Sequence, residues 1–355
     1  MNNYNIKKAD IEKNRNIIFS IFEKNKVGNS NSKFQWNYNN CPFGKTLCYL
    51  IQDENSQEFI GSTSLFKRKF KVIENNVNGA VAGNLCVDQG QRLLVPAIKL
   101  VKASQVESSK EDTQFIYSFP NPNSFGISEG YTEIGEVSRF LNILKITDNA
   151  KKYIPFYTLL IPFLFVFNVL IKLFSKETFL KKRKGLIVET PDSFDNRFDS
   201  LWKKASKQFT IIGIRTSEFL NWRYKEYSYI NYKIFCLVNR SQEIVGYIVY
   251  YIEKDICRVV DMLFLRSDNI LDSLLVEFSR TMRKEGLGYI YIKFFGDSKI
   301  KKNLEKFNFL YDKKYKRIFK NIVESPFLLY CSDKTLGPAL FDEEYWHIFL
   351  GDSDI

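Results

Sequence analysis

The sequence contains the same pattern twice, about 185 residues apart. A Trp-x-Tyr motif begins at Trp36 and again at Trp222, and each is followed by a strand-like apolar run. A Ser-Gln-Glu turn then leads to an apolar residue and a glycine, which is Gly61 in the first copy and Gly246 in the second. Repeats with a period this long indicate duplicated domains rather than the short units of a solenoid.

The length of the chain agrees with a duplication. With 355 residues it can form two domains, each large enough to bury a core of its own. We therefore predict a first domain at 1–146, a linker at 147–190 and a second domain at 191–355.

Hydrophobic periodicity predicts a similar order of elements in both halves. In the first half we expect a helix at 11–24, strands at 47–53, 58–72 and 77–88, a helix at 92–106, a strand at 115–119, a short helix at 123–129 and a strand at 131–138. In the second half we expect helices at 195–207 and 216–225, strands at 232–238, 243–252 and 256–265, a helix at 269–285, a strand at 288–295, a helix at 298–307, and strands at 309–320, 327–331 and 345–350. This order is typical of an α/β (α+β) chain with two tandem domains, each a mixed, mostly antiparallel twisted sheet flanked by helices.

Composition excludes several classes of protein. Hydrophobic residues make up 45% of the chain and aromatic residues 16%, which indicates a packed globular protein. The chain has one histidine and six cysteines without a C-x-x-C pair, so we expect no zinc or other metal site. We find no cleavable signal peptide and expect a reducing, cytoplasmic location. The net charge of +12 suits an anionic partner, but no nucleic-acid motif accompanies it, so we do not expect nucleic acid to bind.

The linker combines an apolar run with a basic one. Residues 154–171 carry no charge, and residues 148–185 hold eight basic and two acidic residues. Three alternatives fit this segment: a helix packed between the domains, a helix in the membrane interface, or a membrane span interrupted by Pro155 and Pro162. In the second alternative, 151–184 would make peripheral contact with the inner face of a membrane, because clustered lysines attract anionic lipid.

Four stretches carry a resemblance to a known family. They are the Trp36-Asn-Tyr-x-x-x-Pro-x-Gly44 motif, the passage from Gly83 to Ala97, the passage from Tyr117 to Tyr131, and Phe219–Tyr224 together with the terminal Gly-Asp-Ser-Asp354. With the order of elements, they make the chain resemble the GCN5-related N-acetyltransferase (GNAT) superfamily. More narrowly, it is similar to the tandem-domain proteins of bacterial polysaccharide biosynthesis clusters, and more distantly to Fem-type transferases.

The resemblance implies an acyl-CoA-dependent N-acyltransferase. Acetyl-CoA or another acyl-CoA would be the donor, and the acceptor would be an amino sugar or sugar nucleotide of surface polysaccharide synthesis. Two alternatives remain open: an aminoacyl transferase of Fem type that uses charged tRNA, or a catalytically degenerate pair of domains that acts as a binding or scaffold protein.

The resemblance also implies where the donor would bind. The pantetheine would lie between the fourth and fifth strands, and the pyrophosphate would face the N-terminus of the following helix. Matching positions are Leu85, Cys86, Val87, Arg92, Leu93, Leu94, Val95, Ala97 and Asn121. Val95 replaces a glycine of the family motif and narrows the room for phosphate. The matching turn of the second half has no glycine and contains Asp268, so we expect the second half not to bind CoA.

Acyl transfer to an amine needs a base that keeps the amine neutral. Glu133 and Glu136, on the predicted strand 131–138, are candidates, although both could be ordinary exposed strand residues. His347 is the only histidine and is a third candidate, although the structural role of a residue on a face of the last strand is the favoured interpretation.

Candidate substrate-binding residues come from the second half. Arg223 lies between Trp222 and Tyr224, an arrangement that suits a phosphate or carboxylate clamp, and Asp352 and Asp354 could bind hydroxyls or an amino group. The aromatic residues could instead anchor a helix to its sheet in each half, and the two aspartates could belong to a solvated tail.

Overall fold

The computed structural model describes residues 4–28, 30–88, 94–121, 127–146, 161–181, 183–227, 229–267, 269–315 and 325–354. Several predictions fall wholly or partly outside these residues. They are the phosphate-binding residues Arg92 and Leu93 with the start of the helix predicted at 92–106, the short helix at 123–129, the uncharged run before residue 161, the turn residue Asp268 and the end of the strand predicted at 309–320. Of that last strand, the described part forms β14 only at Phe309–Tyr311.

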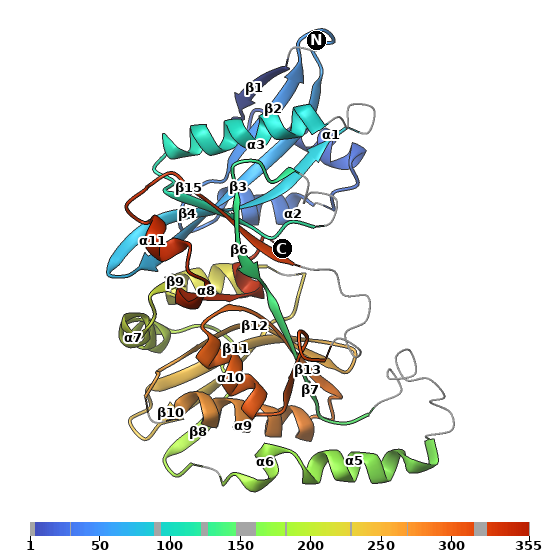
Figure 1. Ribbon diagram of the computed structural model, residues 1–355, viewed down its shortest axis with the longest axis vertical. Coiled ribbons are helices and arrows are strands. Elements are labelled where there is room, and N and C mark those ends of the chain that lie inside the picture. Colours follow the sequence, from blue (N-terminus) through green and yellow to red (C-terminus); the bar gives the residue numbers. More distant parts are fainter. Residues whose placement is uncertain are drawn as a thin grey trace.

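The first half contains a long, twisted set of strands with helices on its faces (Figure 1). In chain order its elements are β1 (Tyr4–Lys8), α1 (Arg15–Lys24), α2 (Asn31–Phe34), η1 (Gln35–Asn39), β2 (Leu47–Asp53), β3 (Phe59–Val72), β4 (Asn75–Val87), α3 (Leu94–Ser109), β5 (Phe115–Ser118), β6 (Thr132–Glu136) and β7 (Ser138–Ile143).

The second half follows the same plan after a connecting helical segment. In chain order its elements are η5 (Ile161–Phe163), α5 (Leu164–Leu173), α6 (Lys176–Phe179), β8 (Leu186–Glu189), α7 (Asn196–Ala205), η6 (Ser206–Gln208), β9 (Ile211–Gly213), α8 (Ser217–Tyr224), β10 (Lys233–Asn239), β11 (Ile244–Glu253), β12 (Ile256–Phe264), α9 (Ile270–Lys284), β13 (Tyr289–Gly296), α10 (Ser298–Lys306), β14 (Phe309–Tyr311), β15 (Pro326–Cys331), α11 (Gly337–Leu340), η7 (Glu343–Tyr345), β16 (Trp346–Phe349) and η8 (Leu350–Asp352). The predicted fold class, a mixed sheet with helices in two related halves, is confirmed.

Helix α9 shows how the sequence produces this packing. Its apolar residues recur every three or four positions, which places Leu271, Leu274, Leu275 and Phe278 on one face. That face lies on the sheet, where Phe278 packs edge-on against Phe235 of β10, with 5.2 Å between the ring centroids.

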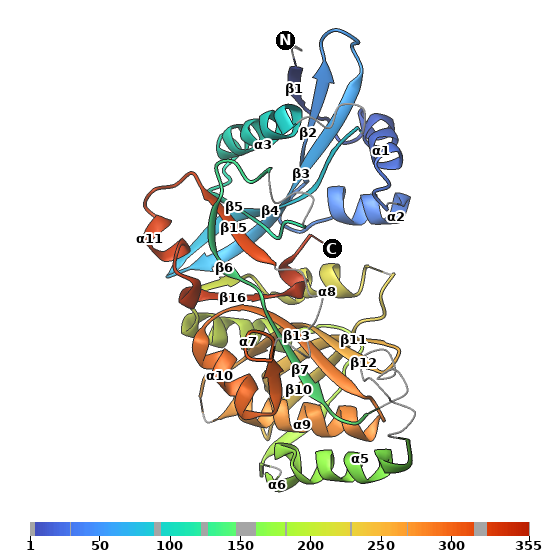
Figure 2. The same ribbon diagram turned by 45° about the vertical axis from the view of Figure 1, so that its right-hand side comes forward.

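The two halves exchange one strand each. β7 leaves the first half and pairs antiparallel with β13 and β14 of the second half. β15 leaves the second half and lies between β5 and β6 of the first half. The exchange is visible in Figure 2, where β6 and β7 run from the upper half into the lower one. Both halves therefore depend on backbone hydrogen bonds from the other half.

Both halves contain a splayed pair of parallel strands. β4 and β5 pair from Gly79 to Val81. Beyond this point the two strands separate, and the described residues 82–88 do not pair with the described residues 118–121. β12 and β13 pair from Ile256 to Val259 and then separate in the same way. In the second half, β16 fills the opening and pairs antiparallel with the last residues of β13.

The repeated tryptophans meet at the junction of the halves. The rings of Trp36 and Trp222 stack with their centroids 5.0 Å apart, and each indole N–H donates to the backbone carbonyl of the other residue, at 2.7 and 3.1 Å. The two copies of the motif thus form one reciprocal contact near a local pseudo-twofold axis.

Helices α5 and α6 lie at the end of the second half that is farthest from the first half (Figure 1). Because α5 has no buried residue, the alternative of a helix packed between the domains is wrong for this helix. Among the described residues, no helix is both long and apolar enough to cross a membrane.

Candidate functional site

Two adjoining pockets lie where the splayed strands of the first half meet the junction. The first, called here the strand pocket, has a volume of about 270 Å³ and is lined by Gly83, Asn84 and Leu85 of β4 and by residues 118–121 after β5. The second, called the junction pocket, has a volume of about 310 Å³ and is lined by Phe349, Leu350 and Ser353 of the last segment, with Lys293 of β13. Both pockets share Phe119, Pro120, Asn121 and Asp354.

A bulge in β4 opens the strand pocket. The register between β3 and β4 shifts near Ser62, and Asn84 has a positive φ of 51°. A bulge bends its strand, and here the bend accompanies the separation of β4 from β5. The Asn84 side chain donates to the Tyr38 hydroxyl at 2.9 Å, and that hydroxyl also contacts the Ser64 hydroxyl at 2.7 Å, so side chains of the core hold the bulge.

Asp354 lies at the point where the two pockets meet. A Cβ atom built on Gly83 would lie only 2.3 Å from its Oδ2 atom, so the absence of a side chain at Gly83 allows the carboxylate to approach β4. Burial raises the pKa of the Asp354 carboxyl above its ordinary value, although a hydrogen bond from its own backbone N–H and the charges of Arg223 and Arg68 oppose the rise.

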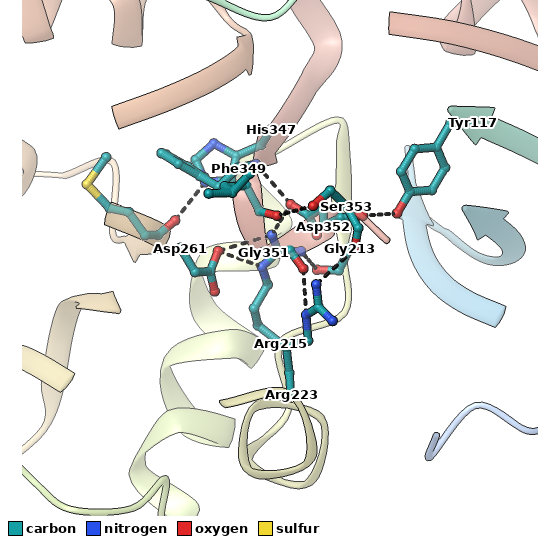
Figure 3. A network of polar contacts seen from close by, with 12 residues as sticks. Tyr117, Gly213, Arg215, Arg223, Asp261, His347, Phe349, Gly351, Asp352 and Ser353 are labelled. Atoms are coloured by element: carbon teal, nitrogen blue, oxygen red, sulfur yellow. Dashed lines mark hydrogen bonds and ion pairs between the residues drawn. The ribbon is translucent and has the colours of Figure 1, made fainter. Parts of the chain in front are cut away.

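A buried polar network holds the segment that carries Asp354 (Figure 3). Arg223 donates from Nε to the Gly351 carbonyl and from Nη2 to the Ser353 carbonyl, both at 2.8 Å. The Tyr117 hydroxyl of β5 donates to the Asp352 carbonyl at 2.6 Å. The terminal segment is therefore fixed by groups from both halves of the chain.

Arg215 stands at the centre of this network. Its Nη2 atom lies 2.6 Å from Asp352 Oδ2 and 3.1 Å from Asp261 Oδ1, and all three side chains are buried. The two carboxylates raise the pKa of Arg215 well above its ordinary value in spite of its burial. Burial raises the pKa of Asp261, which Tyr247 also contacts with its hydroxyl at 2.9 Å. Charges buried in this way are structural, because no substrate can reach them.

His347 is also internal. Its ring is fully buried, Nε2 contacts the Met262 carbonyl of β12 at 2.9 Å, and the ring packs on Phe209. Burial lowers the pKa of His347 well below its ordinary value, so the ring is neutral. It lines neither pocket and closes the opening between β12 and β13.

The other predicted bases and clamps lie outside the two pockets. Glu133 is exposed on β6, and Glu136 forms an ion pair with Lys313 at 3.1 Å. Trp222, Arg223 and Tyr224 are buried in α8, and Arg223 holds the terminal segment through its backbone carbonyls.

The predicted donor-binding residues are partly brought together. Leu85 and Asn121 line the strand pocket, whereas Cys86 and Val87 are buried at the end of β4. Leu94, Val95 and Ala97 begin α3; Val95 is exposed and Ala97 is buried. Arg92 and Leu93 lie outside the described residues.

Several residues of the site were not predicted from the sequence. No sequence motif assigns a role to Tyr117, Arg215 or Asp261, although a carboxylate inside the apolar run Val259-Val260-Asp261-Met262-Leu263 is a signal for a buried, paired charge. Among the described residues, no three histidine, cysteine or acidic side chains gather as metal ligands would.

The fold is similar to that of solved N-acyltransferases. A probable N-acyltransferase from Enterococcus faecalis V583 matches with a TM-score of 0.64 and 10% identity, over 98% of this chain and 85% of that one. A GCN5-related N-acetyltransferase from Anabaena variabilis matches with a TM-score of 0.62 and 11% identity, over 92% and 72%. The N-myristoyltransferase of Saccharomyces cerevisiae, solved with bound myristoyl-CoA, matches with a TM-score of 0.55 and 12% identity, over 92% and 82%. No family model matches the sequence, and no curated protein matches it.

Proposed function

We propose that this chain, which shares its fold with N-acyltransferases, transfers an acyl group from acyl-CoA to an amine. The observation that carries the proposal is the meeting of two pockets at one partly buried carboxylate, Asp354. The strand pocket would receive the acyl end of the donor, and the junction pocket would receive the acceptor.

The strand pocket fits an extended donor. The separated edges of β4 and β5 can offer backbone groups to a pantetheine chain, as adjacent strands offer them to one another. Asn84, Leu85, Ser118 and Asn121 would line such a chain. The equivalent opening of the second half is filled by β16, which supports a single donor site in the first half. The donor would supply an activated carbonyl carbon and a thiol leaving group.

Asp354 would act as the base. An amine attacks only when it is neutral, and a carboxylate whose pKa is raised toward the working pH takes a proton more readily than an ordinary one. Because it lines both pockets, Asp354 would accept the proton of the acceptor ammonium beside the acyl group. Arg223 and Tyr117 would position it through the backbone of 351–353.

The junction pocket favours an acceptor that also carries an anionic group. Lys293 lines this pocket, and its pKa is lowered by burial and by the nearby charges of Arg139 and Arg258. A lysine and a carboxylate in the lining of one pocket suit a molecule with a phosphate and an amine. The amino sugar nucleotide implied by the resemblance has both groups.

Thermal unfolding with and without about 1 mM acetyl-CoA tests donor binding, with desulfo-CoA, ATP and a longer acyl-CoA alongside. A ligand present at about 100 times its Kd raises the free energy of unfolding by about 2.7 kcal/mol, which shifts the Tm by several degrees. If no acyl-CoA shifts the Tm, the donor assignment fails and a binding or scaffold role becomes the better one.

Thiol release in the presence of a panel of amino sugars then tests the base. Asp354→Asn should keep the thermal shift but lose about 100-fold or more in kcat, because the proton acceptor is gone. Glu133→Gln makes the same chemical change on exposed β6 and should leave kcat unaltered. Equal kcat values for wild type and Asp354→Asn would reject the assignment of the base.

A further inference from the structure

Helix α5 exposes its apolar face to solvent, whereas a helix on the surface of a protein in water normally buries that face. The half-buried positions Leu164, Asn168 and Ile171 recur every three or four residues and face the protein. The opposite face consists of Phe165, Val166, Val169, Leu170 and Leu173, which are 78%, 53%, 40%, 41% and 50% exposed. A helix on the surface of a globular protein normally has charged residues on this face.

Polar contacts hold the helix in this orientation. The Asn168 side chain accepts from the Ile146 N–H at 2.7 Å and thereby fastens α5 to the residue stretch after β7. In α6, buried Glu177 pairs with Arg283 of α9 at 2.7 Å, and Arg280 of α9 donates to the Glu177 carbonyl at 2.7 Å. These contacts fix α5 and α6 as one ridge whose apolar side chains are exposed. The ridge lies at the end of the molecule (Figures 1 and 2).

The ridge is also strongly basic. Its exposed cations among the described residues are Lys172, Lys176, Lys181, Arg183 and Lys184. The only acidic residue among the described residues of 161–184 is Glu177, which is buried against Arg283. Two further large apolar side chains, Phe174 and Phe179, stand beside these lysines and are 74% and 68% exposed.

We propose that the α5–α6 ridge lies in the interface of an anionic lipid bilayer. A membrane interface provides apolar acyl chains for the phenylalanine, valine and leucine side chains of the ridge. It also provides phosphate headgroups for the neighbouring lysines. A second copy of this chain would bring the same lysines against one another, so charge complementarity favours the lipid. The proposal is independent of the assignment of the donor and acceptor pockets.

Co-sedimentation of the full chain with vesicles tests this. The vesicles contain phosphatidylcholine alone or with about one third phosphatidylglycerol. We expect binding to the anionic vesicles, weaker at high salt because salt screens the lysines. Lys176→Ala and Lys181→Ala should each weaken binding about fivefold.

A matched pair of variants distinguishes the contribution of the apolar face of α5 to vesicle binding from the general effect of adding a negative charge to the surface. Val166 on α5 and Val106 on α3 are both helical and both 53% exposed. Val166→Asp should weaken vesicle binding by about tenfold or more, because it places a carboxylate among acyl chains, whereas Val106→Asp should not change it.

Three outcomes would overturn the proposal. They are no binding to anionic vesicles, binding that Val166→Asp leaves unchanged, and self-association in solution that Val166→Asp abolishes without any vesicle binding. The last outcome would assign the ridge to contact between copies of the chain. Sedimentation velocity without lipid measures that self-association, and circular dichroism verifies that each variant is folded.

Discussion

His347 gives a residue-scale test, because it is the only histidine of the chain. Its pKa is lowered in the folded protein, so it takes up a proton only on unfolding. The stability that it contributes is therefore complete above the unfolded pKa of about 6.5 and is lost as the pH falls below that value.

His347→Gln should remove this pH dependence, since a glutamine amide can still donate to the Met262 carbonyl but does not titrate. Between pH 6.5 and 5, the wild type should lose up to about 2 kcal/mol of unfolding free energy relative to the variant. Urea denaturation at several pH values measures the difference. Parallel pH curves for the two proteins would show that the histidine is not buried in its neutral form.

At the residue scale the sequence indicated some positions but not their roles. Asp352 and Asp354 are two residues apart and were given the same expected role, yet one is sealed against Arg215 and the other faces two pockets. Hydrophobic periodicity cannot distinguish the surroundings of these two aspartates, because the segment forms a short 3-10 turn. Its direction is set by hydrogen bonds from Arg223 and Tyr117, which lie on distant elements. Similarly, Trp36 and Trp222 were expected to anchor each half separately, whereas each hydrogen-bonds to the other.

At the scale of elements, agreement is close wherever one segment carries a strong pattern. β2 was predicted at 47–53 and occupies Leu47–Asp53, and α10 was predicted at 298–307 and occupies Ser298–Lys306. The pattern at 131–138 predicts one strand, but the range contains β6 and the start of β7, which pair with β15 and with β13 and β14 in different halves of one continuous sheet. Strand partners are non-local, and a hydrophobic pattern shows which face of a strand is buried but not which strand lies beside it.

Gly296 provides a prediction about elements, because it ends β13 where β16 enters the opening. Its φ is +129°, and a Cβ atom there would lie 1.7 Å from the Trp346 carbonyl oxygen. Gly296→Ala should therefore displace β16 and lower the free energy of unfolding by about 2 kcal/mol or more, as measured by urea denaturation.

Gly337 is the matched control for this substitution. An added Cβ would meet nothing nearer than 3.6 Å, and the residue begins helix α11, where alanine is favoured over glycine. Gly337→Ala should be neutral or slightly stabilising. If both variants were equally stable, β16 would not depend on the close approach at Gly296.

For the whole molecule, the exchange of β7 and β15 predicts cooperative unfolding. Each half contributes one strand to the other half, and among the described strands β6 pairs only with β15. Calorimetry should show one transition whose calorimetric and van't Hoff enthalpies agree. Residues 1–146 alone should not fold stably, because β5 would expose an unpaired edge. Two separate transitions would contradict this expectation.

Gly83 and Asp354 touch across the strand pocket, yet 271 residues of sequence separate them. A chain that grows on the ribosome at about 5–20 residues per second makes β4 roughly 15–50 seconds before it makes Asp354. During that interval β5 also lacks β15, and Tyr117 lacks the carbonyl to which it donates. The strand pocket therefore cannot be complete until Asp354 has been synthesised. Until then the first half of the nascent chain has an incomplete pocket and an unpaired β5 edge, to which chaperones can bind.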